Sequence, residues 1–227
     1  MIFRYNTSKE TCVIIFPKKR KVEKIFLKKK REIRNELDGN SWYLKNLKIK
    51  NKKLNIKNHS TYISVLNLPF HQGQQVKFWQ NIKINFSYIL RVLNHYRAVW
   101  PNQKFVPFHG DLTLSNVIFG NTNKNVKIID WEFFKKKKCL WGLDICYFLI
   151  STLSLPVLTR KNKNIYENEK KIFKRLWKTF FYKQKLEYLK NPFEYILKKK
   201  LVKPSNFIYK LPNKTKNEIL QIIKTKI

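Results

Sequence analysis

Three of the four aspartates in this chain lie in one short window, and their surroundings suggest a chemical role. The 227 residues contain 49 lysines and arginines but only 14 acids, and Asp111, Asp130 and Asp144 stand within 34 residues of one another. Asn116 follows Asp111 by five positions. Carboxylate and amide oxygens suit Mg²⁺, which also binds substrate phosphates. A further carboxylate can accept the proton of an attacking hydroxyl group.

The local pattern predicts a hairpin that brings these residues together. Residues 117–119 and 126–131 are apolar and typical of strands, and a run of glycine, asparagine and threonine separates them. Asp111 and Asn116 precede the first strand, and Asp130 lies near the end of the second. Because antiparallel pairing joins those two ends, we expect the three side chains to converge at one end of the hairpin.

Two motifs in this window resemble those of a known superfamily. They are His109-Gly-Asp-Leu-Thr-Leu-Ser-Asn116 and Ile128-Ile-Asp-Trp-Glu132. Together they are similar to the aminoglycoside phosphotransferase and choline kinase superfamily, whose members have a protein-kinase-like fold. The general kinase catalytic loop has the same spacing from aspartate to asparagine. A downstream Gly142-Leu-Asp144 also fits the superfamily pattern.

The resemblance implies a role for each matching residue. Asp111 would be the catalytic base for the acceptor hydroxyl, and His109 would support its loop. Asn116 and Asp130 would hold Mg²⁺ between the phosphates of ATP. Asp144 would brace the catalytic loop and is expected to be structural.

A kinase-like fold also needs a strand lysine for the nucleotide phosphates and a helix glutamate that orients it. Lys24 lies in a segment typical of a strand, and Glu36 lies on the next expected helix, with Glu32 as an alternative partner. The resemblance supports the pair Lys24–Glu36. Residues 1–38 contain no glycine, so a Gly-rich phosphate loop is absent. The basic turn 18–21 could cover the phosphates instead, by charge.

The remaining sequence predicts an α+β architecture in two parts. Residues 1–68 would form a reduced nucleotide-binding lobe and residues 69–227 a larger helical lobe that carries the catalytic hairpin. In the first part we expect strands at 2–5, 11–16, 22–27 and 62–66, a helix at 31–48 and a loop at 48–58. A hinge is expected near 64–70. An apolar stripe with helical period predicts a helix at 76–100, and the chain after residue 144 is expected to be mostly helical.

The net charge of +35 allows a second interpretation, in which the chain binds nucleic acid or an anionic membrane surface. Genome composition explains the charge better, because 41 of the basic residues are lysine and asparagine, isoleucine, phenylalanine and tyrosine are also abundant. Any nucleic-acid binding is therefore expected to be unspecific, and membrane association weak. The apolar stretch 145–159 is too short for a bilayer and predicts a buried helix. The absence of a secretory signal and three unpaired cysteines predict a cytoplasmic protein.

The sequence thus favours an ATP- and Mg²⁺-dependent kinase that acts on a hydroxyl group of a small acceptor. The acceptor would be a sugar, an amino alcohol or an envelope saccharide. The scarcity of acids in the C-terminal part favours a sugar or an anionic acceptor over a polycationic aminoglycoside. Because glycines are missing near the N-terminus, a pseudokinase that binds nucleotide without turnover stays an alternative.

Overall fold

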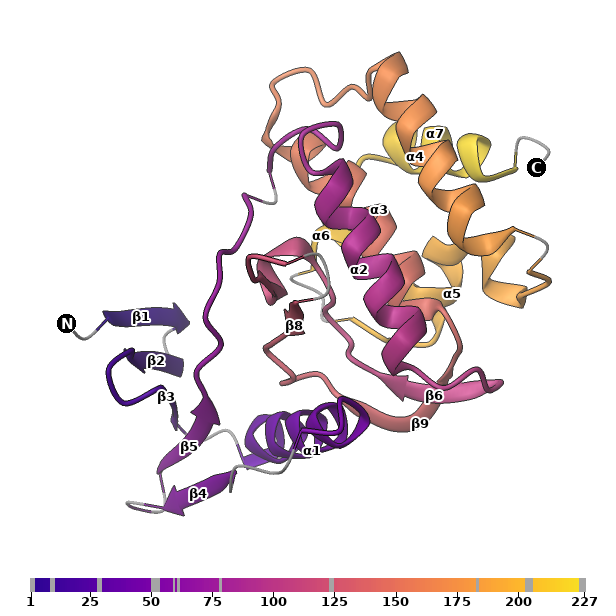
Figure 1. Cartoon of the computed structure of the whole chain (residues 1–227). Coiled ribbons are helices and arrows are strands. Elements are labelled where there is room, and N and C mark those ends of the chain that lie inside the picture. Colours follow the sequence, from indigo (N-terminus) through magenta and orange to yellow (C-terminus); the bar gives the residue numbers. More distant parts are fainter. Residues whose placement is uncertain are drawn as a thin grey trace.

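The protein is described by a computed structural model that covers residues 3–8, 11–27, 30–49, 54–58, 60, 62–77, 79–122, 125–182, 184–202 and 206–224. Strands dominate its N-terminal part and helices its C-terminal part (Figure 1). The expected α+β class is confirmed. The combination of a small antiparallel sheet with a helical part is compatible with a kinase-like fold.

The N-terminal part is built on a five-stranded antiparallel sheet. Its strands are β1 (Phe3–Ser8), β2 (Thr11–Phe16), β3 (Lys21–Leu27), β4 (Asn55–Asn58) and β5 (Ile63–Pro69), in the order β1-β2-β3-β5-β4. The expected loop at 48–58 is wrong in its last residues, which form β4 at the sheet edge; its residues 50–53 lie outside the described part. β5 also runs three residues beyond the expected strand.

One helix, α1 (Lys30–Asn46), lies between this sheet and the rest of the molecule (Figure 1). Near its N-terminal end, Ile33 packs with Phe26 and Leu66 of the sheet in a small apolar cluster. Near its C-terminal end, Tyr43 belongs to the large core of the C-terminal part, and Trp42 packs against that core. The helix therefore contributes to both apolar clusters.

The C-terminal part combines helices with two small strand pairs. Its elements are α2 (Phe86–Val99), β6 (Phe105–Phe108), β7 (Val117–Phe119), β8 (Val126–Ile128), β9 (Lys135–Leu140), α3 (Leu143–Thr159), α4 (Glu167–Phe181), α5 (Pro192–Lys198), α6 (Phe207–Lys210) and α7 (Asn213–Lys224). β7 and β8 form the expected hairpin, although β8 is shorter than 126–131. β6 pairs antiparallel with β9, and this pair was not expected from the sequence.

The expected helix at 76–100 is wrong over its first ten residues. Helix α2 begins only at Phe86, because the chain before it is tied to the hairpin by backbone hydrogen bonds between Gln74 and Phe119 at 2.8 and 2.9 Å. The side chain of Asn85 also donates to the carbonyl of Lys77 at 3.1 Å and stabilises the turns in between. Ile82, one of the apolar residues in the helical-period stripe, is buried in the core although it lies before the helix begins.

Helix α3 forms the centre of the C-terminal core and is buried along almost its whole length. This confirms the expectation of a buried helix at 145–159. Within the described residues, none of the helices has the combination of length and apolar character that a bilayer crossing requires. Cys12, Cys139 and Cys146 are not joined in any disulfide.

Candidate active site

The hairpin brings the expected polar residues to one end. Val117 pairs with Ile128, and just beyond this pair the backbone N–H of Ile129 donates to the carbonyl of Asn116 at 3.0 Å. The side-chain amide of Asn116 donates to the carbonyl of Asp111 at 2.7 Å and thereby closes the preceding loop. Asp130 follows directly, with a positive φ of 65° that turns the chain away from the strand direction.

Lys24 on β3 joins the N-terminal sheet to this hairpin through ion pairs. Its Nζ lies 2.9 Å from Oε2 of Glu36 and 2.5 Å from Oδ1 of Asp130, and its side chain is buried. A third carboxylate, Glu132 Oε1, lies at 3.0 Å. Burial alone would lower the pKa of Lys24, but the three carboxylates outweigh it and hold the pKa well above its usual value. Lys24 is therefore a permanent positive charge.

Glu132 is a member of this cluster that sequence reasoning did not assign. Glu36, Asp130 and Glu132 each offer an oxygen, and the three oxygens lie within 4.8 Å of one another. Lys24 supplies one positive charge against these three carboxyl groups, so the cluster would attract a further cation. The motif Ile128-Ile-Asp-Trp-Glu132 contains this glutamate two positions after Asp130, but the resemblance implies a role only for the aspartate.

Helix α1 lies close to the segment that follows β8, and this makes the contacts around Lys24 possible. Gly39 lies so near to Trp131 that a Cβ atom at this position would be 2.6 Å from the Trp131 Cβ. Glu36, one helical turn earlier, therefore reaches Lys24. The Asn35 side chain also donates to the carbonyl of Glu132 at 2.8 Å. The helix thus holds both the glutamate and the segment that follows the hairpin.

Asp111, in the loop before β7, is half-buried and has a defined set of partners. Its Oδ1 accepts a hydrogen bond from the hydroxyl of Tyr147 at 2.7 Å, and its Oδ2 lies 3.4 Å from the amide nitrogen of Asn116. Burial raises the pKa of Asp111 to about 6, while the hydrogen bond from Tyr147 acts in the opposite direction. At neutral pH the carboxylate is mostly ionised and able to accept a proton.

His109 has the position of a structural support. It is fully buried, its Nε2 donates to the carbonyl of Ile129 at 3.0 Å, and its Nδ1 accepts from the N–H of Asp111 at 3.3 Å. Burial lowers its pKa to about 4, so the ring is neutral at physiological pH. The backbone N–H groups of His109 and Gly110 donate to the Asp144 carboxylate at 2.9 and 3.2 Å. Asp144 thus contacts the backbone of the loop and not the cluster around Lys24.

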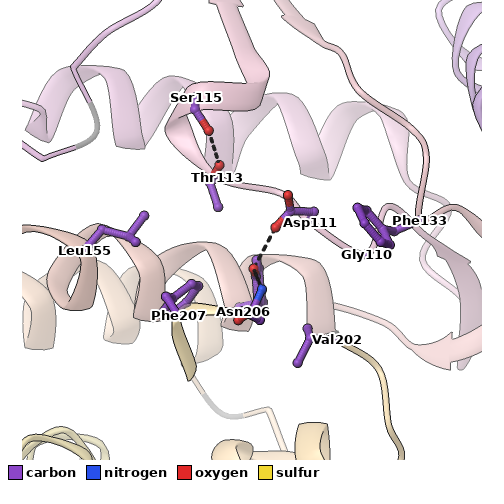
Figure 2. Close-up of a pocket in the computed structure, with 10 residues that line it drawn as sticks. Gly110, Asp111, Thr113, Ser115, Phe133, Leu155, Val202, Asn206 and Phe207 are labelled. Carbon is purple, nitrogen blue, oxygen red and sulfur yellow. Dashed lines mark hydrogen bonds between the residues drawn. The ribbon is translucent and has the colours of Figure 1, made fainter. Parts of the chain in front are cut away.

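A pocket of about 310 Å³ opens beside Asp111 (Figure 2). Its wall combines apolar side chains with hydroxyl and amide groups from the loop, α3 and the segment that leads into α6. The lining residues are Gly110, Asp111, Thr113, Ser115, Phe133, Tyr147, Leu155, Val202, Asn206 and Phe207. Asp111 is the sole ionisable acid or base among the described lining residues, apart from the tyrosine hydroxyl.

The basic turn 18–21 joins β2 to β3 and lies beside the chain that follows β5. The N–H of Phe70, the first residue after β5, donates to the carbonyl of Arg20 at 3.3 Å. Residues 9 and 10, which connect β1 to β2 in the sequence, lie outside the described residues. A role of the basic turn in covering phosphates therefore stays a prediction, with no support from its position.

A comparison with known protein families gives a match over the segment that contains the β7–β8 hairpin. The model of the phosphotransferase enzyme family matches residues 48–136, a range that includes Asp111, Asn116 and Asp130. Lys24 and Glu36 lie before the matched range. No curated protein matches the chain. Over residues 48–136 the chain therefore matches the phosphotransferase enzyme family of aminoglycoside phosphotransferases and choline kinases, and the resemblance seen in its motifs is confirmed.

Proposed function

We propose that the protein is a small-molecule kinase that transfers the γ-phosphoryl group of ATP to a hydroxyl group of a small acceptor. The observation that carries this proposal is the ion-pair cluster of Lys24 with Glu36 and Asp130. The cluster joins a strand lysine and a helix glutamate of the N-terminal part to the acidic end of the hairpin. This is the set of groups that kinases need around nucleotide phosphates.

The residues present fit a Mg²⁺ ion. Asp130 and Glu132 supply carboxylate oxygens. The amide nitrogen of Asn116 is already engaged, because it donates to the carbonyl of Asp111 in the loop. Among the described residues no group donates to Oδ1 of Asn116, so this oxygen is available as a ligand. Oxygen donors of this kind are the ones that Mg²⁺ prefers. When bound, Mg²⁺ would neutralise negative charge on the transferred phosphoryl group.

The chain's own residues would then act mainly by position and charge. Lys24 is a fixed cation, held by Glu36, and would attract the nucleotide phosphates. Asp111 would accept the proton of the acceptor hydroxyl. At the same time the hydroxyl oxygen bonds to the γ-phosphorus, and the bond between the γ-phosphorus and the oxygen that bridges it to the β-phosphate breaks, so that ADP leaves. His109 and Asp144 would keep the loop in place. Such positioning and preorganised charge account for most of the catalysis in phosphoryl transfer.

The pocket beside Asp111 is the proposed acceptor site. Its volume lies at the lower end of the range for small-molecule sites, about 300–1,000 Å³, and therefore favours a compact acceptor. Thr113, Ser115 and Asn206 offer hydroxyl and amide groups for a hydroxyl-bearing ligand. Among the described residues that line the pocket, Asp111 is the one acid. A polycationic acceptor would therefore lose hydration on binding and gain few ion pairs in return. A sugar-like acceptor fits these properties best.

The test is thermal unfolding of the protein with and without Mg-ATP, repeated on Asp130→Ala. A ligand at 100 times its dissociation constant should stabilise the wild type by about 2.7 kcal/mol. We expect a Mg²⁺-dependent shift that Asp130→Ala loses and that Asp38→Ala, an exposed control on α1, keeps. No shift of the wild type at millimolar Mg-ATP would exclude an active kinase.

Turnover is tested separately from binding. Asp111→Asn should keep the Mg-ATP shift but lose phosphoryl transfer, because the amide cannot accept the proton. A protein that binds Mg-ATP through Asp130 but transfers no phosphoryl group to water, sugars or amino alcohols would instead be the pseudokinase. Equal loss of binding and turnover in Asp111→Asn would contradict its role as the base.

A further inference from the structure

Three hydrogen bonds connect Asp111 with the C-terminal part of the chain. The hydroxyl of Tyr147, on α3, donates to Oδ1 of Asp111 at 2.7 Å. The side-chain amide nitrogen of Asn206 donates to the Tyr147 oxygen, also at 2.7 Å. The Oδ1 atom of Asn206 accepts from the backbone N–H of Ile208 at 3.1 Å. Asn206 thus caps α6 and contacts Tyr147 at the same time.

The directions of these bonds follow from one another. Because Oδ1 of Asn206 is held by a backbone N–H, which can only donate, the amide nitrogen must be the atom that faces Tyr147. The Tyr147 oxygen then accepts from Asn206, and its single proton is left for Asp111. The chain of donors therefore ends at the carboxylate, and the acceptor pocket contains no second described carboxylate that competes for this proton.

This arrangement assigns different tasks to the two oxygens of Asp111. Oδ1 is bound to Tyr147, whereas Oδ2 lies 3.4 Å from the Asn116 nitrogen, too far for a strong hydrogen bond. A carboxylate rotates easily about its last bond unless one oxygen is held. Tyr147 is itself fixed, since its side chain is 1% exposed and its ring packs on Phe207 at a centroid distance of 5.3 Å.

We propose that Tyr147, oriented by Asn206, is a positioning residue that holds Oδ1 of Asp111 and leaves Oδ2 for the hydroxyl group of the acceptor. The inference rests on the proposed function, in which Asp111 is the base. Tyr147 also lines the acceptor pocket. So do Asn206 and Phe207, which Figure 2 shows on the same side of the pocket. The wall that would contact the acceptor is therefore the same structure that orients the base.

The kinetic test uses Mg-ATP hydrolysis, with water as the acceptor, because the natural acceptor is unidentified. Tyr147→Phe should lower kcat about 10- to 100-fold and leave KM for Mg-ATP within twofold, since a misplaced base slows the transfer step without touching the nucleotide site. The matched control is Tyr188→Phe, which removes a hydroxyl that donates to the carbonyl of Trp141 at 2.7 Å in the same core. It should keep kcat.

A second variant guards against misfolding of Tyr147→Phe. Asn206→Ser keeps an oxygen that can cap α6 but is too short to replace the amide at Tyr147. It should lower kcat less than Tyr147→Phe does, and again without a change in KM. If wild-type protein turns over and both variants keep wild-type kcat, the positioning role is wrong even though the proposed function stands.

A spectroscopic readout tests the contact without turnover. The chain has only four aspartates, so protein labelled with ¹³C at aspartate carboxyl groups gives four side-chain signals. Asp111→Asn assigns one of them. At pH 8, Tyr147→Phe should move this signal and leave that of Asp144, whereas Tyr188→Phe should move neither. An unmoved Asp111 signal in Tyr147→Phe would overturn the inference, and absence of wild-type turnover would overturn the proposed function alone.

Discussion

Replacement of Gly39 by alanine sets two effects of known size against each other. Gly39 lies inside α1, where alanine is favoured over glycine by about 1 kcal/mol through helix propensity alone. A Cβ atom, however, would lie 2.6, 2.8 and 2.9 Å from three atoms of Trp131. These distances are too short for any carbon contact, so either the helix or the indole must move.

The indole has little freedom to move. Trp131 is fully buried, and the rings of Trp42, Trp100 and Phe134 surround it at centroid distances of 6.0, 6.1 and 5.7 Å. Overpacking of a filled core costs about 1–3 kcal/mol. With the propensity gain subtracted, we expect Gly39→Ala to lower the free energy of unfolding by up to about 2 kcal/mol. If helix propensity were the sole effect, the same substitution would raise the free energy of unfolding.

The assay is urea unfolding followed by tryptophan fluorescence, with position 38 as the internal reference. Asp38 is exposed on the same helix, so Asp38→Ala should be about 1 kcal/mol more stable than Asp38→Gly. At position 39 the order should reverse. The displaced helix should also carry Glu36 away from Lys24 and raise KM for Mg-ATP. If alanine is the more stable residue at both positions, α1 does not lie against Trp131.

Three further predictions concern ionisable groups of the site. Lys24→Met leaves the buried Glu36 without its cation and should cost about 3–5 kcal/mol in urea unfolding, and Lys24→Met/Glu36→Leu should recover most of it. Because the pKa of Asp111 is raised to about 6, kcat should fall as the pH drops below 6, and a profile that is flat down to pH 5 would contradict its role as base. The folded pKa of His109, about 4, lies below its ordinary 6.5, so protonation favours the unfolded chain. Stability should fall by about 3 kcal/mol on this account between pH 6.5 and 4, and His109→Gln should flatten that dependence in unfolding titrations.

The parts of the site that follow from local pattern could be predicted from the sequence. A short turn between two apolar segments leaves one pairing, so the convergence of Asp111, Asn116 and Asp130 required no knowledge of distant contacts. The contact between Lys24 and Glu36 was expected from the order of a strand and a helix and from the resemblance. The resemblance, unlike composition, identified which one of 41 lysines to consider.

The parts that depend on distant contacts could not be predicted in this way. β9 reads Lys-Lys-Lys-Lys-Cys-Leu and has poor strand propensity, and it forms only because β6, some 30 residues earlier, pairs with it. Residues 76–85 have helical periodicity, but Gln74 just before them is hydrogen-bonded to Phe119 of the hairpin, and the backbone hydrogen bonds described within 77–85 close local turns. The contact of Asn206 with Tyr147 spans 59 positions and leaves no trace in spacing.

The position of α1 in two apolar clusters has a consequence for how the chain folds. Among the side chains whose burial is described, the cluster under the N-terminal sheet has three buried members, Phe26, Ile33 and Leu66, with Leu37, Ile56 and Leu68 partly buried against them. A core of this size is too small to stabilise a folding unit on its own. Tyr43, on the same helix, accepts a hydrogen bond from the N–H of Ile128 at 2.9 Å and is buried in the other core. A fragment cut after residue 68 would therefore expose this end of α1 and fail to fold, whereas the whole chain should unfold in a single cooperative transition.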